Sequence, residues 1–229
     1  MRSRYSNVVL VIPAYNEGAA IRATIEAIPD EFPHVFVIDD GSTDDTRAQV
    51  SATRATLIRH PINLGQGAAL QTGIDVALLD PTITYIVTFD ADGQHRIEDV
   101  RNMLAHAELN DLDVVLGSRF LGAAINMPTT KRLILKAAVW FSNLTSGVRL
   151  TDTHNGLRVI HRRAAERLKL ELPDFSHASE IVERIGQQRF SYAEVPVTII
   201  YSDYSRGKGQ SIINAVNIAF DALLRKAIR

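Results

Sequence analysis

Two carboxylates lie one residue apart at Asp90 and Asp92, directly after an apolar run, and Gln94 and His95 follow at once. Such a polar cluster is costly to bury unless its charges are paired or hold a metal ion. Carboxylate and amide oxygens suit Mg²⁺ or Mn²⁺, which proteins typically hold with one or two carboxylates together with substrate phosphates. We therefore predict a divalent-cation site at Asp90, Asp92 and Gln94, the alternative being a solvated turn. His95 is either a further ligand or a hydrogen-bonding group beside an acceptor.

Similar polar clusters follow three other apolar runs, namely "PAYNE" (13–17), "DDGSTDDT" (39–46) and "GSR" (117–119). The runs are rich in β-branched residues, as buried strands are, and segments with helical spacing alternate with them. This alternation predicts an α/β fold with a mostly parallel central sheet flanked by helices. The expected strands are 7–13, 34–42, 55–60, 84–92 and 112–120, and the expected helices are 17–28, 43–53, 63–79 and 96–109. Because ligands bind beyond the carboxyl ends of such strands, we expect the clusters to converge on one crevice.

The pattern changes after Phe120. We expect a helix from near Pro128 and then a loop, short strand and helix within 151–168. A helix over 175–188, a strand over 191–203 and a basic loop with a long helix complete the chain. The simplest division is a catalytic domain over 1–200 and a basic loop with an amphipathic helix over 201–229.

Composition excludes several classes of protein. The 229 residues contain no cysteine, which excludes disulfides, thiolate chemistry and cysteine-based zinc sites. A formal net charge of −1 gives no reason to expect nucleic acid as a partner. The first strand is not followed by G-x-G-x-x-G, which argues against a dinucleotide-binding site. No G-x-x-x-x-G-K-[ST] loop is present, which excludes a P-loop NTPase. We find no signal peptide or membrane-spanning run and expect a cytoplasmic location.

Five segments occur in a characteristic order and spacing: "VVLVIPAYNE", "VIDDGSTDDT", "NLGQGAALQTGI", "FDADGQH" and "GSRF". Together they resemble the family 2 glycosyltransferases of GT-A fold, and most of all the dolichyl- and polyprenyl-phosphate sugar transferases. The resemblance is strong over 8–120 and looser through "DTHNGLRVI" and "YSDYSRGKGQ". It implies sugar transfer from a nucleotide diphosphate sugar, either UDP- or GDP-linked, and usually with inversion.

The resemblance also implies roles for positions on the donor side. Pro13, Tyr15 and Glu17 would line the nucleoside pocket. Asp40 would accept a hydrogen bond from the base, while Asp39 would shape the loop.

On the phosphate side, the pair at Asp90 and Asp92 with Gln94 would hold the Mg²⁺ or Mn²⁺ on the diphosphate. Arg119 would meet the donor or acceptor phosphate. The loop with Arg206 and Lys208 would close over phosphates, or it is a solvated basic turn.

The acceptor decides which catalytic groups are needed. A polyprenyl phosphate is already an anion and needs no strong base. A saccharide hydroxyl, as in surface-polysaccharide synthesis, needs one, and Asp152 or His154 are then the candidates. The predicted catalytic residues are therefore Asp92, Arg119, Asp152 and His154. A third possibility is a module that recruits partners without turnover.

A lipid-phosphate acceptor requires contact with a membrane surface. The segment 131–144 combines apolar residues and Trp140 with Lys131, Arg132 and Lys136, which suits either a membrane interface or packing on its own domain. The stripe formed by Ile212, Val216, Ala219 and Leu223 could cover the core, lie on the membrane or join copies of the chain. The enzyme would be peripheral at the inner membrane face, held by these helices or by a small membrane protein.

The remaining histidines carry less information. His60, His106 and His161 have no acidic residue at ligand spacing, and we interpret them as surface histidines. His177 and Glu180 begin a helix, and facing an acceptor is a minority interpretation for them.

Overall fold

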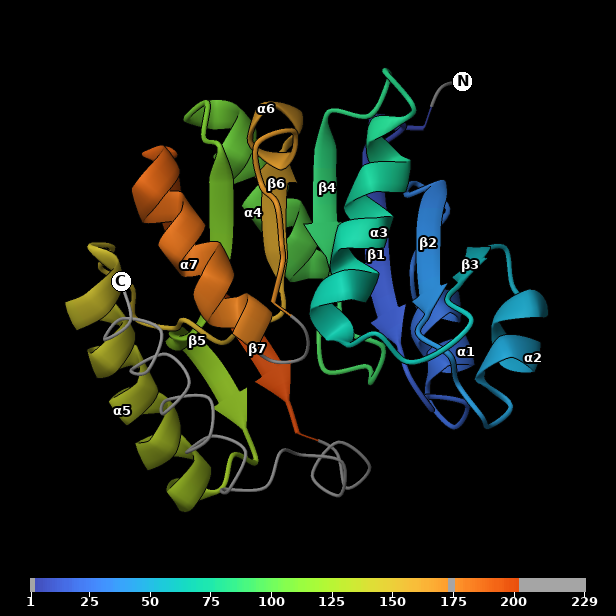
Figure 1. Ribbon diagram of the computed structural model, residues 1–229, viewed down its shortest axis with the longest axis horizontal. Helices are drawn as coiled ribbons and strands as arrows, with labels where there is room; N and C mark the ends of the chain where they lie inside the picture. The colour runs from blue at the N-terminus through green and yellow to red at the C-terminus, as the bar shows by residue number, and fades with distance from the viewer. Residues whose placement is uncertain (1–2, 173–175, 202–229) are drawn as a thin grey trace.

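Seven strands form one sheet in the computed structural model, which describes residues 3–172 and 176–201. Their order across the sheet is β3-β2-β1-β4-β6-β5-β7 (Figure 1). The strands are β1 (Val8–Ala14), β2 (His34–Asp39), β3 (Thr56–Arg59), β4 (Tyr85–Thr88), β5 (Val114–Ile125), β6 (Arg158–His161) and β7 (Tyr192–Ile200).

Strand direction places the polar clusters at one edge. β1 is parallel to β2 and β4, β2 to β3, and β5 to β7. β6 runs antiparallel to both of its neighbours, β4 and β5, so these two strands share a direction. The carboxyl ends of β1, β2, β4 and β5 therefore lie on the same side, and the predicted mostly parallel sheet is confirmed.

Helices cover both faces of the sheet (Figure 1). They are α1 (Ile21–Glu26), α2 (Thr46–Ser51), α3 (Gln66–Leu78), α4 (Ile97–Leu109), α5 (Thr129–Ser146), α6 (Arg162–Ala165) and α7 (Ser176–Gln188). Buried residues of α1, α2 and α4 join one apolar core, and those of α3, α6 and α7 join the other. This two-sided burial explains why all seven residues of β1 are apolar and buried.

Small residues allow the closest packing between layers. A Cβ at Gly73 of α3 would lie 2.2 Å from Val11 Cγ1, so only glycine lets α3 approach β1 this closely. The close approach brings the N-terminal end of α3 to the edge where the polar clusters lie.

Most elements are a few residues shorter than expected, and the ends of two strands matter for the site. β4 ends at Thr88 rather than Asp92, because the chain turns at Gly93, which has a φ of +73°. β5 continues to Ile125 rather than Phe120, with an irregularity in its pairing with β7 between Ser118 and Ala123. Because β4 ends early, Asp90 and Asp92 lie in a loop beyond the end of this strand.

The C-terminal region is covered only in part. α5 begins directly after Pro128, as expected, and lies at the periphery beside α7 (Figure 1). No helix among the described residues is long and apolar enough to cross a membrane. The division at residue 200 stays a prediction, and the C-terminal helix lies outside the described residues.

Candidate active site

Asp90 is held by two neighbours just beyond β4. Its Oδ2 lies 2.8 Å from Nε2 of the buried His95. A Cβ at Gly156 would lie 2.3 Å from Asp90 Oδ1, so that loop passes directly against the carboxylate. His95 therefore positions Asp90. The sequence left the role of His95 open, because it does not show which group the imidazole contacts.

Asp92 is less constrained than Asp90. Among the described residues, its hydrogen-bond donor is Gln94, through the backbone N–H at 3.1 Å and through the side-chain amide. Burial raises the pKa of Asp92, and the negative charge of Asp90 raises it further. Burial also pushes the pKa of Asp90 upward, but His95 outweighs it and holds this pKa below its usual value. Two carboxylates that repel each other at the mouth of a cleft form a site that a cation stabilises.

The donor set fits Mg²⁺ or Mn²⁺. Within residues 3–172 and 176–201, no three His, Cys, Asp or Glu side chains gather in a metal-binding arrangement. The predicted site would therefore consist, on the protein side, of Asp90 and Asp92 with Gln94, which is hydrogen-bonded to Asp92, and their binding of a cation stays a prediction. Two hard carboxylates suit an ion that takes its remaining oxygens from phosphates and water.

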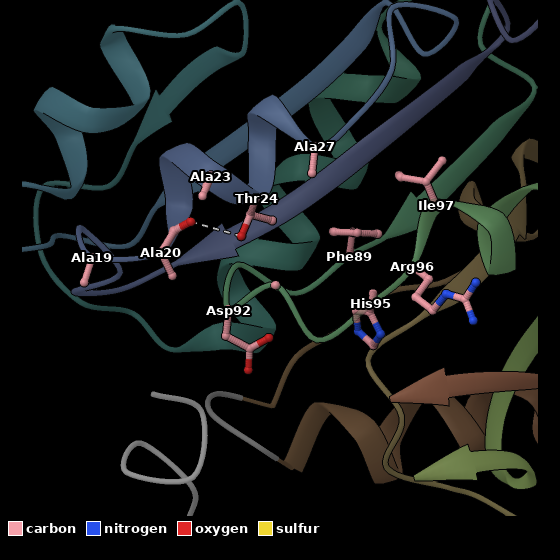
Figure 2. A pocket seen from close by; sticks show the side chains of 11 residues that line it. Ala19, Ala20, Ala23, Thr24, Ala27, Phe89, Asp92, His95, Arg96 and Ile97 are labelled. Atoms are coloured by element: carbon pink, nitrogen blue, oxygen red, sulfur yellow. Dashed lines mark hydrogen bonds between the residues drawn. The ribbon is translucent and has the colours of Figure 1, made fainter. Parts of the chain in front are cut away.

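A cavity of about 590 Å³ opens beside this pair, between α1 and residues 89–97 (Figure 2). Asp92 and His95 belong to its lining, and Ala20, Ala23 and Ala27 form much of the opposite wall. Thr24 joins the two sides, because its hydroxyl donates to the Ala91 carbonyl at 2.9 Å. The bond fixes the loop that carries the carboxylates against α1.

The predicted nucleoside residues lie at the ends of β1 and β2. Pro13 is buried opposite Ile38, whereas Tyr15, just past β1, is 45 % exposed. The Glu17 backbone N–H donates to Thr46 Oγ1 at 2.8 Å. The chain thus brings Tyr15 and Glu17 to the same edge as the carboxylate pair, and their contact with a nucleoside stays a prediction.

Asp40 is hydrogen-bonded to several groups inside the protein. It is buried, and its carboxylate accepts from the backbone N–H groups of Leu64 and Gly65 at 2.9 and 2.8 Å. His60 Nδ1 lies 2.7 Å from the same carboxylate, and its Nε2 lies 2.9 Å from Thr72 Oγ1. The interpretation of His60 as a surface histidine was wrong, because its acidic partner is 20 residues away in sequence. Whether Asp40 also contacts a base stays a prediction.

Asp39 shapes its own loop. Its Oδ1 accepts from the Ser42 backbone N–H at 2.9 Å, and its Oδ2 lies 3.5 Å from Arg59 Nε. These contacts agree with the expected loop-shaping role.

Arg119 and Asp152 form a buried ion pair at the end of β5. Arg119 Nε lies 2.6 Å from Asp152 Oδ2, which also accepts from the Arg119 backbone N–H at 3.0 Å. Arg119 Nη1 donates to the Tyr201 hydroxyl at 2.7 Å. Glu194 fixes the loop by accepting from the backbone N–H groups of Thr151 and Asp152. Arg119 is therefore held rigidly in place.

The structure does not support Asp152 or His154 as a free general base. Asp152 is 2 % exposed and committed to Arg119, so taking up a proton would break the ion pair. Burial lowers the pKa of His154 to about 4, which makes it a weak base at neutral pH. Sequence spacing could not predict this, because Arg119 lies 33 residues before Asp152.

A small basic cavity adjoins this ion pair. Arg119 and Arg132 line a space of about 120 Å³, together with Phe120, Gly122, Ala124 and Met127. The Lys131 ammonium lies 4.6 Å from the centre of the Tyr201 ring, and burial and the charge of Arg119 lower its pKa. The start of α5 thus adds positive charge beside Arg119.

Other expected residues have different positions. Glu180 is buried and accepts from the backbone N–H groups of Glu171 and Leu172, so it supports a loop rather than facing an acceptor. Arg206 and Lys208 lie outside the described residues. Sequence reasoning missed Arg158, a buried arginine whose pKa is influenced by both Asp90 and Asp152.

Comparison with known proteins agrees with this geometry. The model of the family described as "Glycosyl transferase family 2" matches residues 9–169. An uncharacterised protein of Methanocaldococcus jannaschii is 33 % identical over 96 % of this chain and 92 % of its own length. The UDP-N-acetylglucosamine–dolichyl-phosphate N-acetylglucosaminyltransferase of Methanococcus voltae is 27 % identical over 96 % of each chain.

A solved structure supports the fold. Glucosyl-3-phosphoglycerate synthase from Mycobacterium tuberculosis, in complex with Mg²⁺ and UDP, superposes with a TM-score of 0.70 at 17 % identity, over 93 % of this chain and 75 % of its own. The predicted family is therefore confirmed: the chain belongs to glycosyl transferase family 2 and is a glycosyltransferase of GT-A fold.

Proposed function

We propose that this enzyme transfers a hexose from a nucleotide diphosphate sugar to a polyprenyl phosphate, with Mg²⁺ or Mn²⁺, at a membrane surface. The observation that carries the proposal is the pairing of Asp152 with Arg119 beside a basic cavity. This part of the site has fixed positive charge, and its two candidate bases are an ion-paired aspartate and a histidine whose pKa burial lowers to about 4. It suits an acceptor that arrives as an anion, as a lipid phosphate does.

The part of the site that would bind the sugar donor contributes negative charge. Asp90 and Asp92 would hold the cation, His95 would keep Asp90 in place, and Gln94 would orient Asp92. When bound, the cation supplies electrostatic stabilisation of the leaving nucleoside diphosphate. Tyr15 and Glu17 would contact the nucleoside. The relative from Methanococcus voltae is named for a UDP-linked donor and a dolichyl-phosphate acceptor, which supports this assignment.

The proposed reaction is a single displacement. An oxygen of the acceptor phosphate forms a bond to the anomeric carbon, and the bond from that carbon to the diphosphate breaks, with inversion. Arg119 and Arg132 would hold the acceptor phosphate through charge-assisted hydrogen bonds. No proton has to be removed from this nucleophile, so Asp152 can remain paired with Arg119.

Membrane contact is proposed through α5. Leu133, Trp140 and Leu144 are 65, 69 and 68 % exposed, and their spacing of seven and four residues places them on one side of the helix. Arg132 and Lys136 are also exposed on this helix. An apolar stripe with tryptophan and adjacent basic residues suits an anionic lipid surface.

The test is a panel of donors and acceptors. The full chain is incubated with radiolabelled UDP- and GDP-sugars, Mn²⁺ and either a polyprenyl phosphate or a soluble glycan. We expect label in the organic phase only when polyprenyl phosphate is present, and none after chelation of the metal. Label appearing only in the soluble glycan would contradict the proposed acceptor and favour a polysaccharide pathway.

A further inference from the structure

Arg158 occupies the position between the two charged parts of the site. It is the first residue of β6, the antiparallel strand between β4 and β5, and it pairs with Thr88 and Leu116. Asp90 lies two residues beyond Thr88, and Arg119 lies three residues beyond Leu116. The sheet therefore delivers Arg158 to the ligand-binding edge, with the carboxylate pair on one side and the Arg119 ion pair on the other.

The side chain of Arg158 is buried at this edge of the sheet. The residue is 2 % exposed, and its Nη1 has no hydrogen-bond partner within residues 3–172 and 176–201. None of the ion pairs formed among these residues includes it. Burial lowers the pKa of Arg158 to about 10, although Asp90 and Asp152 act to raise it. Arg158 is therefore still positively charged at neutral pH.

A buried charge of this kind is not explained by stability. Replacing buried charged groups with well-packed neutral ones is often neutral or stabilising. Arg162, the first residue of α6 directly after β6, differs in this respect, because its guanidinium donates to the carbonyls of Leu78, Asp80 and Ile83. Arg162 holds the fold together, whereas the Arg158 charge acts on its neighbours through space.

We propose that Arg158 is a positioning residue that sets the charge balance between the cation site and the phosphate site, acting through Asp90 and Asp152. Its charge moderates the negative potential of the carboxylate pair and thereby limits how tightly the divalent cation is held. Its charge also compensates Asp152, so that Arg119 keeps a net attraction for a phosphate. The inference rests on the proposed function, because it assumes both a cation and an acceptor phosphate.

The test measures two affinities in Arg158→Gln. Binding of Mn²⁺ alone is followed by electron paramagnetic resonance, and binding of geranyl phosphate, a short polyprenyl phosphate, by calorimetry. Removing one positive charge should change the two affinities in opposite directions, with Mn²⁺ binding about tenfold tighter and geranyl phosphate about tenfold weaker. Arg158→Lys keeps the charge and should remain within about threefold of the wild type for both ligands.

Controls separate charge from folding. Arg162→Gln should lower the melting temperature and leave both affinities unchanged, and Arg158→Met repeats the charge removal should the glutamine variant fold poorly. If Arg158→Gln or Arg158→Met lowers the affinity for both ligands, or changes neither affinity, the inference is overturned while the proposed function stays intact. A wild-type protein that binds neither Mn²⁺ nor geranyl phosphate would overturn the proposed function and this inference together.

Discussion

Two regions at the carboxyl edge of the sheet differ in how their charges are paired: the β4 side, with Asp90 and Asp92, and the β5 side, with Arg119 and Asp152. At the β4 side, Asp90 and Asp92 repel each other, and the pKa of Asp92 is raised by burial and by Asp90. At the β5 side, Arg119 is neutralised by Asp152 at 2.6 Å and held by Tyr201. On the β4 side a cation would relieve the repulsion between two carboxylates. On the β5 side the carboxylate is already paired, and Arg132 adds positive charge beside the ion pair.

This difference predicts different consequences of mutation. Removing a carboxylate from the β4 side removes a ligand-binding group and relieves repulsion, so folding should be preserved. Removing either partner on the β5 side leaves a buried charge unpaired, so binding and folding should both suffer.

The largest expected effect is that of Asp92→Ala. We expect transfer to fall about 1,000-fold or more, because the cation loses a carboxylate ligand. The melting temperature should not fall, since within the described part of the chain the hydrogen bonds of Asp92 come from Gln94 alone. Activity is measured with a labelled donor at saturating Mn²⁺, with Asp75→Ala on the exposed side of α3 as the matched control. Wild-type activity in Asp92→Ala would refute the cation site.

Arg119→Gln should weaken both acceptor binding and folding on the β5 side. We expect the KM for polyprenyl phosphate to rise about 100-fold through loss of charge-assisted hydrogen bonds. Unfolding free energy should fall by about 3–5 kcal/mol, because Asp152 stays buried without its partner. The double variant Arg119→Gln/Asp152→Asn should recover much of that stability but not the KM, as measured by denaturant unfolding and kinetics. Recovery of KM in the double variant would contradict direct phosphate binding by Arg119.

Trp140→Ala tests whether the β5 side also meets a membrane. We expect vesicle binding to weaken about tenfold in flotation with anionic liposomes, because an exposed interfacial aromatic is lost. Leu109→Ala removes an even more exposed apolar residue, at 84 %, on α4 and should leave flotation unchanged. Equal losses in both variants would indicate nonspecific adsorption instead.

A smaller effect is expected from pH. Burial lowers the pKa of His154 to about 4, so the unfolded chain binds more protons than the folded one between that value and about 6.5. Stability should therefore decrease as pH falls through this window, by about 2 kcal/mol. His154→Gln should flatten the dependence in denaturant titrations at pH 7 and pH 4.5. An unchanged slope in the variant would show that other groups control acid stability.

Much of the donor side could be predicted from sequence. The strands over β1, β2 and β4 are short, apolar and followed at once by polar residues, so their order and parallel pairing place the clusters at one edge. Asp90 and Asp92 are close in space because they are close in sequence. The same pattern, polar residues directly after an apolar strand, predicts that "PAYNE" and "GSR" lie at this edge.

The partners of these residues could not be predicted in the same way. The sequence predicts a surface position for His60, yet this histidine binds Asp40, 20 positions earlier. Asp152 is a candidate base for a saccharide acceptor, yet it pairs with Arg119, 33 positions earlier. Arg158 has no local signal, because its place beside Asp90 depends on an antiparallel strand that joins β4 and β5.

Strand periodicity and local spacing depend on a few neighbouring residues, and they suffice to predict the fold class, the sheet edge with the polar clusters and the carboxylate pair. Which charges neutralise each other is visible only in the folded chain. That distinction depends on burial and on distances between segments far apart in the chain. Burial fixed Asp152, a possible base in the sequence, as the partner of Arg119. The fold also placed Arg158, whose Nη1 has no hydrogen-bond partner among the described residues, between the two sides.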